Sequence, residues 1–128
     1  MSETTEAAAA FTIDAWEETT YDDPAEGPKL TRVVVRKTYD GVLRGTGVAE
    51  VLTAQGGGSG FVASERIVGT LDGRAGSFVI QHGGLADPDG TTSTFGAIVP
   101  SSGTGELAGI SGEATEGTPG TLTLRYRF

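Results

Sequence analysis

The stretch FVASERIVGTLDGRAGSFVIQHGG, residues 61–84, predicts a β-hairpin in the middle of the chain. Its Asp72-Gly73 step is typical of a two-residue hairpin turn, because both residues accept the positive φ angles that such turns require. On both sides of the turn, apolar residues alternate with polar or small ones, which is the period of a half-buried strand. The segment therefore predicts two antiparallel strands with one face in the core.

The only histidine of the chain, His82, falls on the apolar face of this hairpin. A two-residue loop places Ala63 opposite His82 and Glu65 opposite Ile80, and residues directly opposite each other share a face. A four-residue loop keeps this register, whereas a three-residue loop would change it. The shared face holds Phe61, Ala63, Glu65, Ile67, Phe78, Ile80 and His82. Because this set is mostly apolar, we expect it to point inward, with Glu65 and His82 as diagonal neighbours.

Turn signals elsewhere divide the chain into further short strands. Asp40-Gly41, Gly56-Gly57-Gly58 and Pro88-Asp89-Gly90 separate segments that alternate in the same way. We expect strands at about 11–17, 30–39, 42–53, 60–71, 75–85, 91–99, 106–115 and 121–128. Apolar repeats of helical period are missing, and glycines fall inside strands, where strong coiling of a small sheet requires them. The fold class is therefore all-β, as a single closed eight-stranded antiparallel β-barrel over residues 11–128.

Charge is distributed unevenly along the chain. Its net charge is −8, yet residues 1–28 hold eight acids and no Lys or Arg. We interpret residues 1–10 as a flexible acidic N-terminal arm. The rest of the chain is neutral, which argues against a nucleic-acid partner, since such proteins need a basic face. Without a signal peptide, a cysteine or a membrane-spanning apolar run, the chain is expected to be cytoplasmic, with no membrane partner.

Two more strands extend the apolar face into a pocket. In TLTLRYRF, residues 121–128, Leu122, Leu124, Tyr126 and Phe128 alternate with polar residues. A turn centred on Pro88-Asp89 places Phe95 opposite His82. The expected ligand-binding residues are Phe61, Phe78, Ile80, Phe95, Leu124 and Tyr126. The segment LTRVVVRKTY has apolar residues on both faces, which indicates a covered outer face and favours a homo-oligomer.

The buried pair of Glu65 and His82 has two interpretations. A buried carboxylate is costly unless it is paired, so the pair could serve only to fix strand register. The other interpretation is a general acid/base or polar anchor in an apolar ligand pocket. One histidine with scattered acids supplies too few ligands for a metal, and no cofactor motif is present. No serine stands in a nucleophile-elbow pattern, and GTGELAGISG lacks the lysine of a phosphate loop.

Several motifs together carry a family resemblance. They are WEETTYDDPAEGPKLTR at 16–32, SERIVGT at 64–70, GSFVIQHGG at 76–84 and GTGELAGISGEA at 103–114. On these, nearly the whole chain resembles the bacterial domain-of-unknown-function family 3224, which is placed with the allene oxide cyclase-like barrels. The glycine-rich hairpin is similar to that of allene oxide cyclases and dirigent proteins. The resemblance implies the barrel but no reaction, and no functional residue is transferred from it.

Three functions remain open for such a barrel. The first is a cofactor-free cyclase or isomerase that binds a small hydrophobic molecule and uses Glu65 and His82 as its acid/base pair. The second is a binding barrel without catalysis, and the third is a structural or assembly barrel with a filled core. A pocket that both residues face favours the first two, whereas a solid interior favours the third.

Overall fold

Long antiparallel strands make up the protein. The computed structural model describes residues 3–128, and no helix is present among them. The strands are β1 (Thr5–Asp22), β2 (Lys29–Gly41), β3 (Leu43–Gln55), β4 (Ser59–Leu71), β5 (Arg74–Ala86), β6 (Thr92–Ile98), β7 (Thr104–Gly105), β8 (Ser111–Thr118) and β9 (Thr121–Arg127). The all-β, antiparallel prediction is confirmed. Consequently no helix in the described part of the chain is long and apolar enough to cross a membrane.

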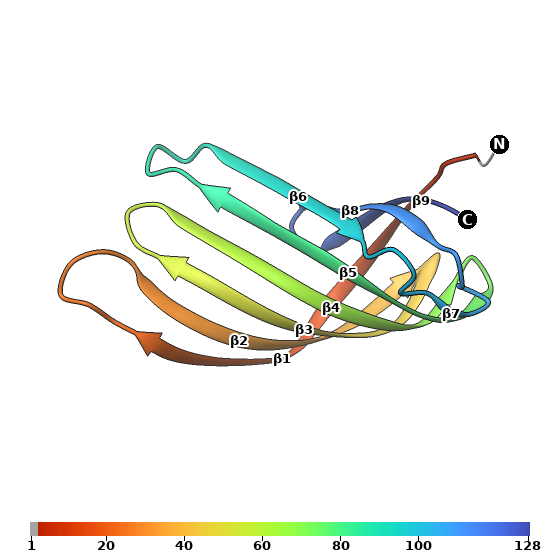
Figure 1. The fold of residues 1–128 in the computed structure, drawn as a ribbon, viewed down its shortest axis with the longest axis horizontal. Helices are drawn as coiled ribbons and strands as arrows, with labels where there is room; N and C mark the ends of the chain where they lie inside the picture. Colours follow the sequence, from red (N-terminus) through yellow and green to blue (C-terminus); the bar gives the residue numbers. More distant parts are fainter. Residues whose placement is uncertain (1–2) are drawn as a thin grey trace.

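The strands follow one another around a ring. Their order is β4-β3-β2-β1-β9-β8-β6-β5, and β4 also pairs with β5, so each of these eight strands has two neighbours. The two-residue β7 is a side branch on β5. Three hairpins, β1–β2, β3–β4 and β5–β6, extend past the shorter β8 and β9, and both chain ends lie at the opposite end (Figure 1). The ring is therefore complete at one end and wider at the other.

The predicted N-terminal arm is wrong in extent. Residues 1–2 lie outside the described residues, but β1 begins at Thr5 and pairs with β9 through residue 10. Ala7 and Ala9 are buried in the core, at 7% and 3% exposure. Alanine is a weak strand former, so the run of four alanines gave no strand signal; it is strand because β9 needs a partner and the interior there accepts only small side chains. The acidic charge of this region stands on a strand.

Asp72-Gly73 forms the predicted turn, and the predicted register is confirmed. Both turn residues have positive φ angles, 50° at Asp72 and 81° at Gly73. Across the hairpin, Ala63 pairs with His82 and Glu65 pairs with Ile80. The turn chemistry therefore placed Glu65 and His82 on the same, interior face of the sheet.

The β5–β6 hairpin differs from its predicted register by one residue. His82 pairs with Gly96, whereas Phe95 pairs with Gly83. The loop runs from Asp87 to Thr91 and is closed by a hydrogen bond from the Asp87 amide to the Thr91 carbonyl. Its odd number of residues shifts the pairing, and a shift of one residue turns every side chain to the other face. Phe95 accordingly points outward and is 53% exposed.

The core fills the closed end of the ring. Phe78, Ile67 and Ile80 are completely buried, and Leu124 and Tyr126 of β9 pack with them. The predicted strand 106–115 begins only at Ser111, because residues 106–110 form a turn that places Leu107 and Ile110 in the same core. A second, smaller core of Val33, Val35 and Ala49 lies along β2 and β3.

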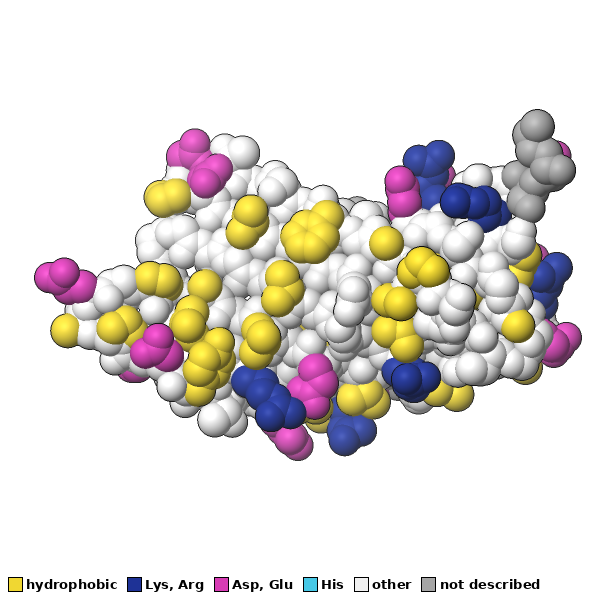
Figure 2. Space-filling view, in the orientation of Figure 1, with side chains coloured by type: hydrophobic (Ala, Val, Ile, Leu, Met, Phe, Trp, Pro, Cys, Tyr) yellow, Lys and Arg dark blue, Asp and Glu magenta, His cyan; other side chains and the backbone are white. Residues whose placement is uncertain are grey.

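The outer surface carries exposed apolar side chains, and three of them lie in one row across the sheet, because Leu52 pairs with Val62 and both Val62 and Phe95 pair with Gly83. On the face in view, Figure 2 shows apolar side chains, with basic and acidic side chains toward the margins. Leu52, Val62 and Phe95 are each about half exposed and stand on β3, β4 and β6. The predicted homo-oligomer stays a prediction.

Candidate functional site

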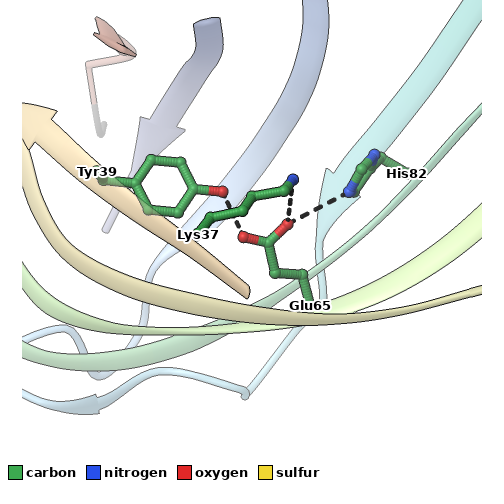
Figure 3. A network of polar contacts seen from close by, with 4 residues as sticks. All are labelled: Lys37, Tyr39, Glu65 and His82. Atoms are coloured by element: carbon green, nitrogen blue, oxygen red, sulfur yellow. Dashed lines mark hydrogen bonds and ion pairs between the residues drawn. The ribbon is translucent and has the colours of Figure 1, made fainter. Parts of the chain in front are cut away.

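Four side chains from three strands form a buried polar cluster inside the ring (Figure 3). Lys37 and Tyr39 come from β2, Glu65 from β4 and His82 from β5. The Lys37 ammonium donates to Oε1 of Glu65 at 3.0 Å, and the Tyr39 hydroxyl donates to Oε2. Nε2 of His82 lies 3.5 Å from Oε1 of the same carboxylate. Glu65 is therefore the centre of the cluster, and its side chain is fully buried.

Small residues on β3 make room for this cluster. β3 runs between β2 and β4, with Gly47 opposite Lys37 and Ala49 opposite Glu65. A Cβ at Gly47 would lie against the Glu65 carboxylate and 3.0 Å from the Tyr39 ring. The missing side chain lets Tyr39 and Lys37 reach across β3 to Glu65. The glycine thus has a steric purpose inside the ring.

The cluster keeps Glu65 ionised. Burial by itself raises the pKa of Glu65, but the contact with His82, the charge of Lys37 and the Tyr39 hydrogen bond together lower that pKa below its ordinary value of 4.5. Burial and the adjacent carboxylate raise the pKa of Tyr39 well above its ordinary value of 10.0. At neutral pH the cluster therefore holds a carboxylate beside a neutral phenol.

His82 is held on one side and open on the other. Its Nε2 is buried and makes no hydrogen bond of normal geometry within residues 3–128; its polar contact is the 3.5 Å approach to Glu65. The Phe61 ring meets the imidazole edge-on, with the ring centroids 5.9 Å apart. Gly96, which faces His82 across the strand pair, leaves space where a Cβ would lie 2.8 Å from the His82 Cβ. The imidazole is thus fixed but only loosely coupled to its carboxylate.

A cavity of about 760 Å³ occupies the wide end of the ring. Its walls are mostly apolar or small and include Phe11, Trp16, Val51 and Phe61. Lys37 and His82 contribute to the lining, but Glu65 and Tyr39 do not. A volume of this size lies within the range of small-molecule sites, about 300–1,000 Å³. The polar cluster is therefore reached from the cavity through Lys37 and His82.

Glu116 is a further acid in the cavity wall. It lies within a register shift between Thr115 and Thr118, where β8 and β9 lose regular pairing. Burial and the Glu65 charge raise the pKa of Glu116 above its ordinary value of 4.5, although Lys37 and His82 act in the opposite direction. Two acids thus interact with the charge of Lys37, Glu116 in the cavity wall and Glu65 behind it, and only Glu65 bonds to Lys37 directly.

The structure separates the predicted site residues into three groups. Phe61 and His82 line the cavity, and Glu65 lies directly behind His82. Phe95 is on the outer face, so its assignment to the pocket was wrong. The remaining four are inward but packed into the closed end of the ring, away from the cavity: Phe78, Ile80, Leu124 and Tyr126.

The predicted site residues did not include Lys37, Tyr39, Trp16 or Glu116. The first two share strand parity with Val33 and Val35, and a uniform alternation along β2 would have placed them inside. Trp16 is inward because of a bulge between Ile13 and Ala15, which sets it opposite Val35. Glu116 had no comparable signal, because it lies at an irregular point of β8.

Metal binding has no support in this arrangement. Within residues 3–128, no three His, Cys, Asp or Glu side chains are grouped so that they could hold a metal ion. Glu65 already accepts from Lys37 and Tyr39, and Glu116 is the one acid among the described residues that line the cavity.

The fold and site define a class: a small, all-antiparallel β protein whose strands form a ring with a polar cluster beneath an apolar cavity. The chain belongs to the DUF3224 family, a family of proteins of unknown function, whose model matches residues 7–128. It is similar to a protein of unknown function from that family in Shewanella oneidensis MR-1, known from a crystal structure. The two share 32% identity with a TM-score of 0.77, over 98% of this chain and 96% of the other. The comparison with curated proteins found no match.

Proposed function

We propose that the ring is a β-barrel of the allene oxide cyclase type, and that its cavity binds a small, largely apolar molecule carrying one polar oxygen group. The observation that carries the proposal is the pair of Lys37 and His82 in the wall of a cavity that is otherwise largely apolar. Binding sites for small molecules combine apolar walls with a few polar groups that fix orientation. The barrel is supported by the β4–β5 pairing, which gives each of the eight strands of the ring two neighbours.

The proposal extends to proton transfer without a cofactor. Glu65 contacts Nε2 of His82, which favours a proton on that nitrogen and leaves Nδ1 as an acceptor. The 3.5 Å contact is long for a hydrogen bond, as is common for catalytic contacts before a substrate binds. A cyclisation or isomerisation directed by confinement and by this imidazole is the reaction class that fits.

The alternative function is a structural barrel with a filled interior. The packed core of Phe78, Ile80 and Leu124 at the closed end favours it for that half of the molecule. In the wide half of the molecule, two features favour the binding function: the cavity, and the buried Nε2 of His82, which has no hydrogen bond of normal geometry within residues 3–128. A barrel that serves only as a scaffold needs neither.

The single tryptophan of the chain offers a direct test, because Trp16 lines the cavity. Its fluorescence is followed during titration with dodecane, 1-dodecanol and dodecanoic acid, which share a chain and differ in head group. The expected result is saturable quenching or a wavelength shift, tightest for a compound with an oxygen group.

A matched pair of variants makes the test specific. Val51→Phe fills cavity volume, whereas Leu52→Phe adds a similar ring on the outer face of the same strand. The first should weaken binding at least tenfold, and the second should leave it within about twofold of wild type. Absence of saturable binding for all three compounds, or equal weakening by both substitutions, would contradict the proposal.

A further inference from the structure

We infer that Lys37 and His82 form a carbonyl-activating pair that moves a proton at the carbon next to the carbonyl group of a small, apolar ketone. This inference rests on the proposed function, because it uses the same cavity. It adds a substrate class, a reaction step and a second residue, Lys37, to the site.

Lys37 has a free donor for a carbonyl oxygen. An ammonium group has three N–H donors. In the described structure one of them binds Oε1 of Glu65 at 3.0 Å, and the charge lies 4.5 Å from the centroid of the Phe11 ring. No second hydrogen bond to Lys37 is formed within residues 3–128, and the side chain lines the cavity. A carbonyl oxygen in the cavity can accept one of the remaining donors.

The two nitrogens are spaced for one small functional group. Lys37 Nζ and His82 Nε2 contact the same oxygen of Glu65, at 3.0 and 3.5 Å, so their separation cannot exceed the sum of those distances. In a ketone the oxygen and the α-carbon are separated by only two bonds. Nδ1, the other nitrogen of the His82 ring, is separated from Nε2 by one ring carbon, so it also lies close to Lys37, and Figure 3 shows the two side chains on either side of the Glu65 carboxylate. Lys37 can therefore bind the oxygen while Nδ1 of His82 lies near a hydrogen on the α-carbon.

The acids around Lys37 favour a neutral carbonyl over a carboxylate. Glu65 is ionised and already compensates the Lys37 charge. Glu116, in the cavity wall, is close enough for the charges of Lys37 and Glu65 to affect it. A carboxylate ligand would add a third acid to this group, and like charges in an apolar cavity repel strongly. A ketone oxygen accepts the Lys37 hydrogen bond without that cost.

The step is balanced without a cofactor. Nδ1 of His82 takes the α-proton, the two electrons of the C–H bond form the enolate, and Lys37 stabilises its oxygen by donating a hydrogen bond. The imidazolium is stabilised by the carboxylate of Glu65. Return of the proton to the α-carbon regenerates the ketone, and return to the γ-carbon of a β,γ-unsaturated ketone gives the conjugated isomer. Glu65 is a positioning residue in this step.

Hydrogen exchange of 2-tetralone in D₂O tests the inference, because each enolisation replaces a hydrogen on C1 with deuterium and NMR counts it. We expect the wild-type protein to raise the exchange rate at least about 100-fold over buffer, the scale of general base catalysis. His82→Gln and Lys37→Met should each remove most of this gain. Arg36→Met, on the outer face beside Lys37, should retain it.

Glu65→Gln tests the positioning role through the split between rate and binding. It should lower the exchange rate at saturating 2-tetralone at least tenfold while the dissociation constant from Trp16 fluorescence changes less than about threefold. A purely structural loss would change both together. Urea midpoints of all variants establish that the assayed protein is folded, and His82→Gln keeps the test decisive if Lys37→Met unfolds.

The outcomes separate the two proposals. Saturable binding of 2-tetralone with exchange no faster than in buffer overturns the carbonyl-activating pair and leaves ligand binding intact. Exchange that is equally fast in His82→Gln also overturns it. Failure of 2-tetralone and of the three dodecyl compounds to affect Trp16 overturns the proposed function itself.

Discussion

Removing the charge of Glu65 should destabilise the protein strongly, and removing Lys37 at the same time should recover part of the loss. Glu65 is fully buried and accepts from both Lys37 and Tyr39. Glu65→Gln keeps the size of the side chain but leaves the Lys37 ammonium, buried at 8% exposure, without a directly bonded counter-charge. Breaking a buried pair in this way costs about 3–5 kcal/mol.

The double variant Lys37→Met/Glu65→Gln contains no uncompensated charge. The glutamine oxygen can still accept from Tyr39, so the double variant should lose only about 1–3 kcal/mol, the cost of imperfectly satisfied polar groups. The two substitutions should therefore be coupled by about 2 kcal/mol or more, with the double variant more stable than Glu65→Gln alone. Urea denaturation at pH 7, with unchanged m-values, measures this cycle.

The exposed pair of Arg32 and Glu50 provides the control. Their side chains are 61% and 54% exposed, and the distance of 3.0 Å between them is the same as in the buried pair. The cycle Arg32→Met/Glu50→Gln should show no coupling beyond experimental error. Additive effects at Lys37 and Glu65, or a double variant less stable than either single variant, would refute the idea that the cluster is held by mutual compensation of buried charge.

Four further outcomes follow from the structure. Glu116→Gln should raise stability at pH 7 but not below pH 4.5. The pKa of Glu116 is raised in the folded protein, so the wild type loses stability as the pH rises through that pKa. Equal gains in stability at both pH values in urea melts would contradict this prediction. Deleting residues 2–10 removes every β1–β9 pair and should abolish cooperative unfolding, whereas deleting residues 2–4 should not; equal midpoints would show that β1 does not complete the ring. Gly47→Ala should cost about 1–3 kcal/mol by crowding Glu65, while Gly57→Ala, with open space around it, should be near neutral in the same melts. Phe61→Ala should weaken the Trp16 titration severalfold and Phe95→Ala should not, and a larger effect at Phe95 would place the ligand on the outer face.

The sequence predicted the fold wherever local chemistry determined it. Asp72-Gly73 admits few turn geometries, so the pairing of β4 with β5 and the inward position of Glu65 and His82 could be derived from residue types alone. The Pro88-Asp89-Gly90 turn was less restrictive. Its hydrogen bonds close a loop with an odd number of residues, which shifts the strand register by one residue from the predicted one. Phe95 therefore lies on the outer face, although it was predicted to lie inside.

The candidate site could be predicted only in part, because it depends on distant strands. Lys37 and Tyr39 reach Glu65 across Gly47, a contact that combines three strands and a missing side chain. The inward position of Trp16 depends on a bulge at Asp14, which no local turn signal marks. The extent of the cavity depends on the unequal lengths of β8, β9 and the three long hairpins, and strand ends are the least certain part of a sequence-based prediction. The cytoplasmic location stays a prediction.

The unequal strand lengths also affect how copies of this protein meet in solution. β9 accompanies β1 only to residue 10, so from Thr12 to Asp22 one edge of β1 has no strand beside it in the described structure. An exposed edge is a template onto which another chain can add. Here that edge bears Asp14, Glu17, Glu18 and Asp22, with no base among residues 1–28. The acidic residues therefore keep copies of the protein apart, because the exposed edge of one copy repels the same edge of another. High salt screens this repulsion and acid neutralises it. Under those conditions we expect copies to pair edge to edge and aggregate, which matters for storage and crystallisation.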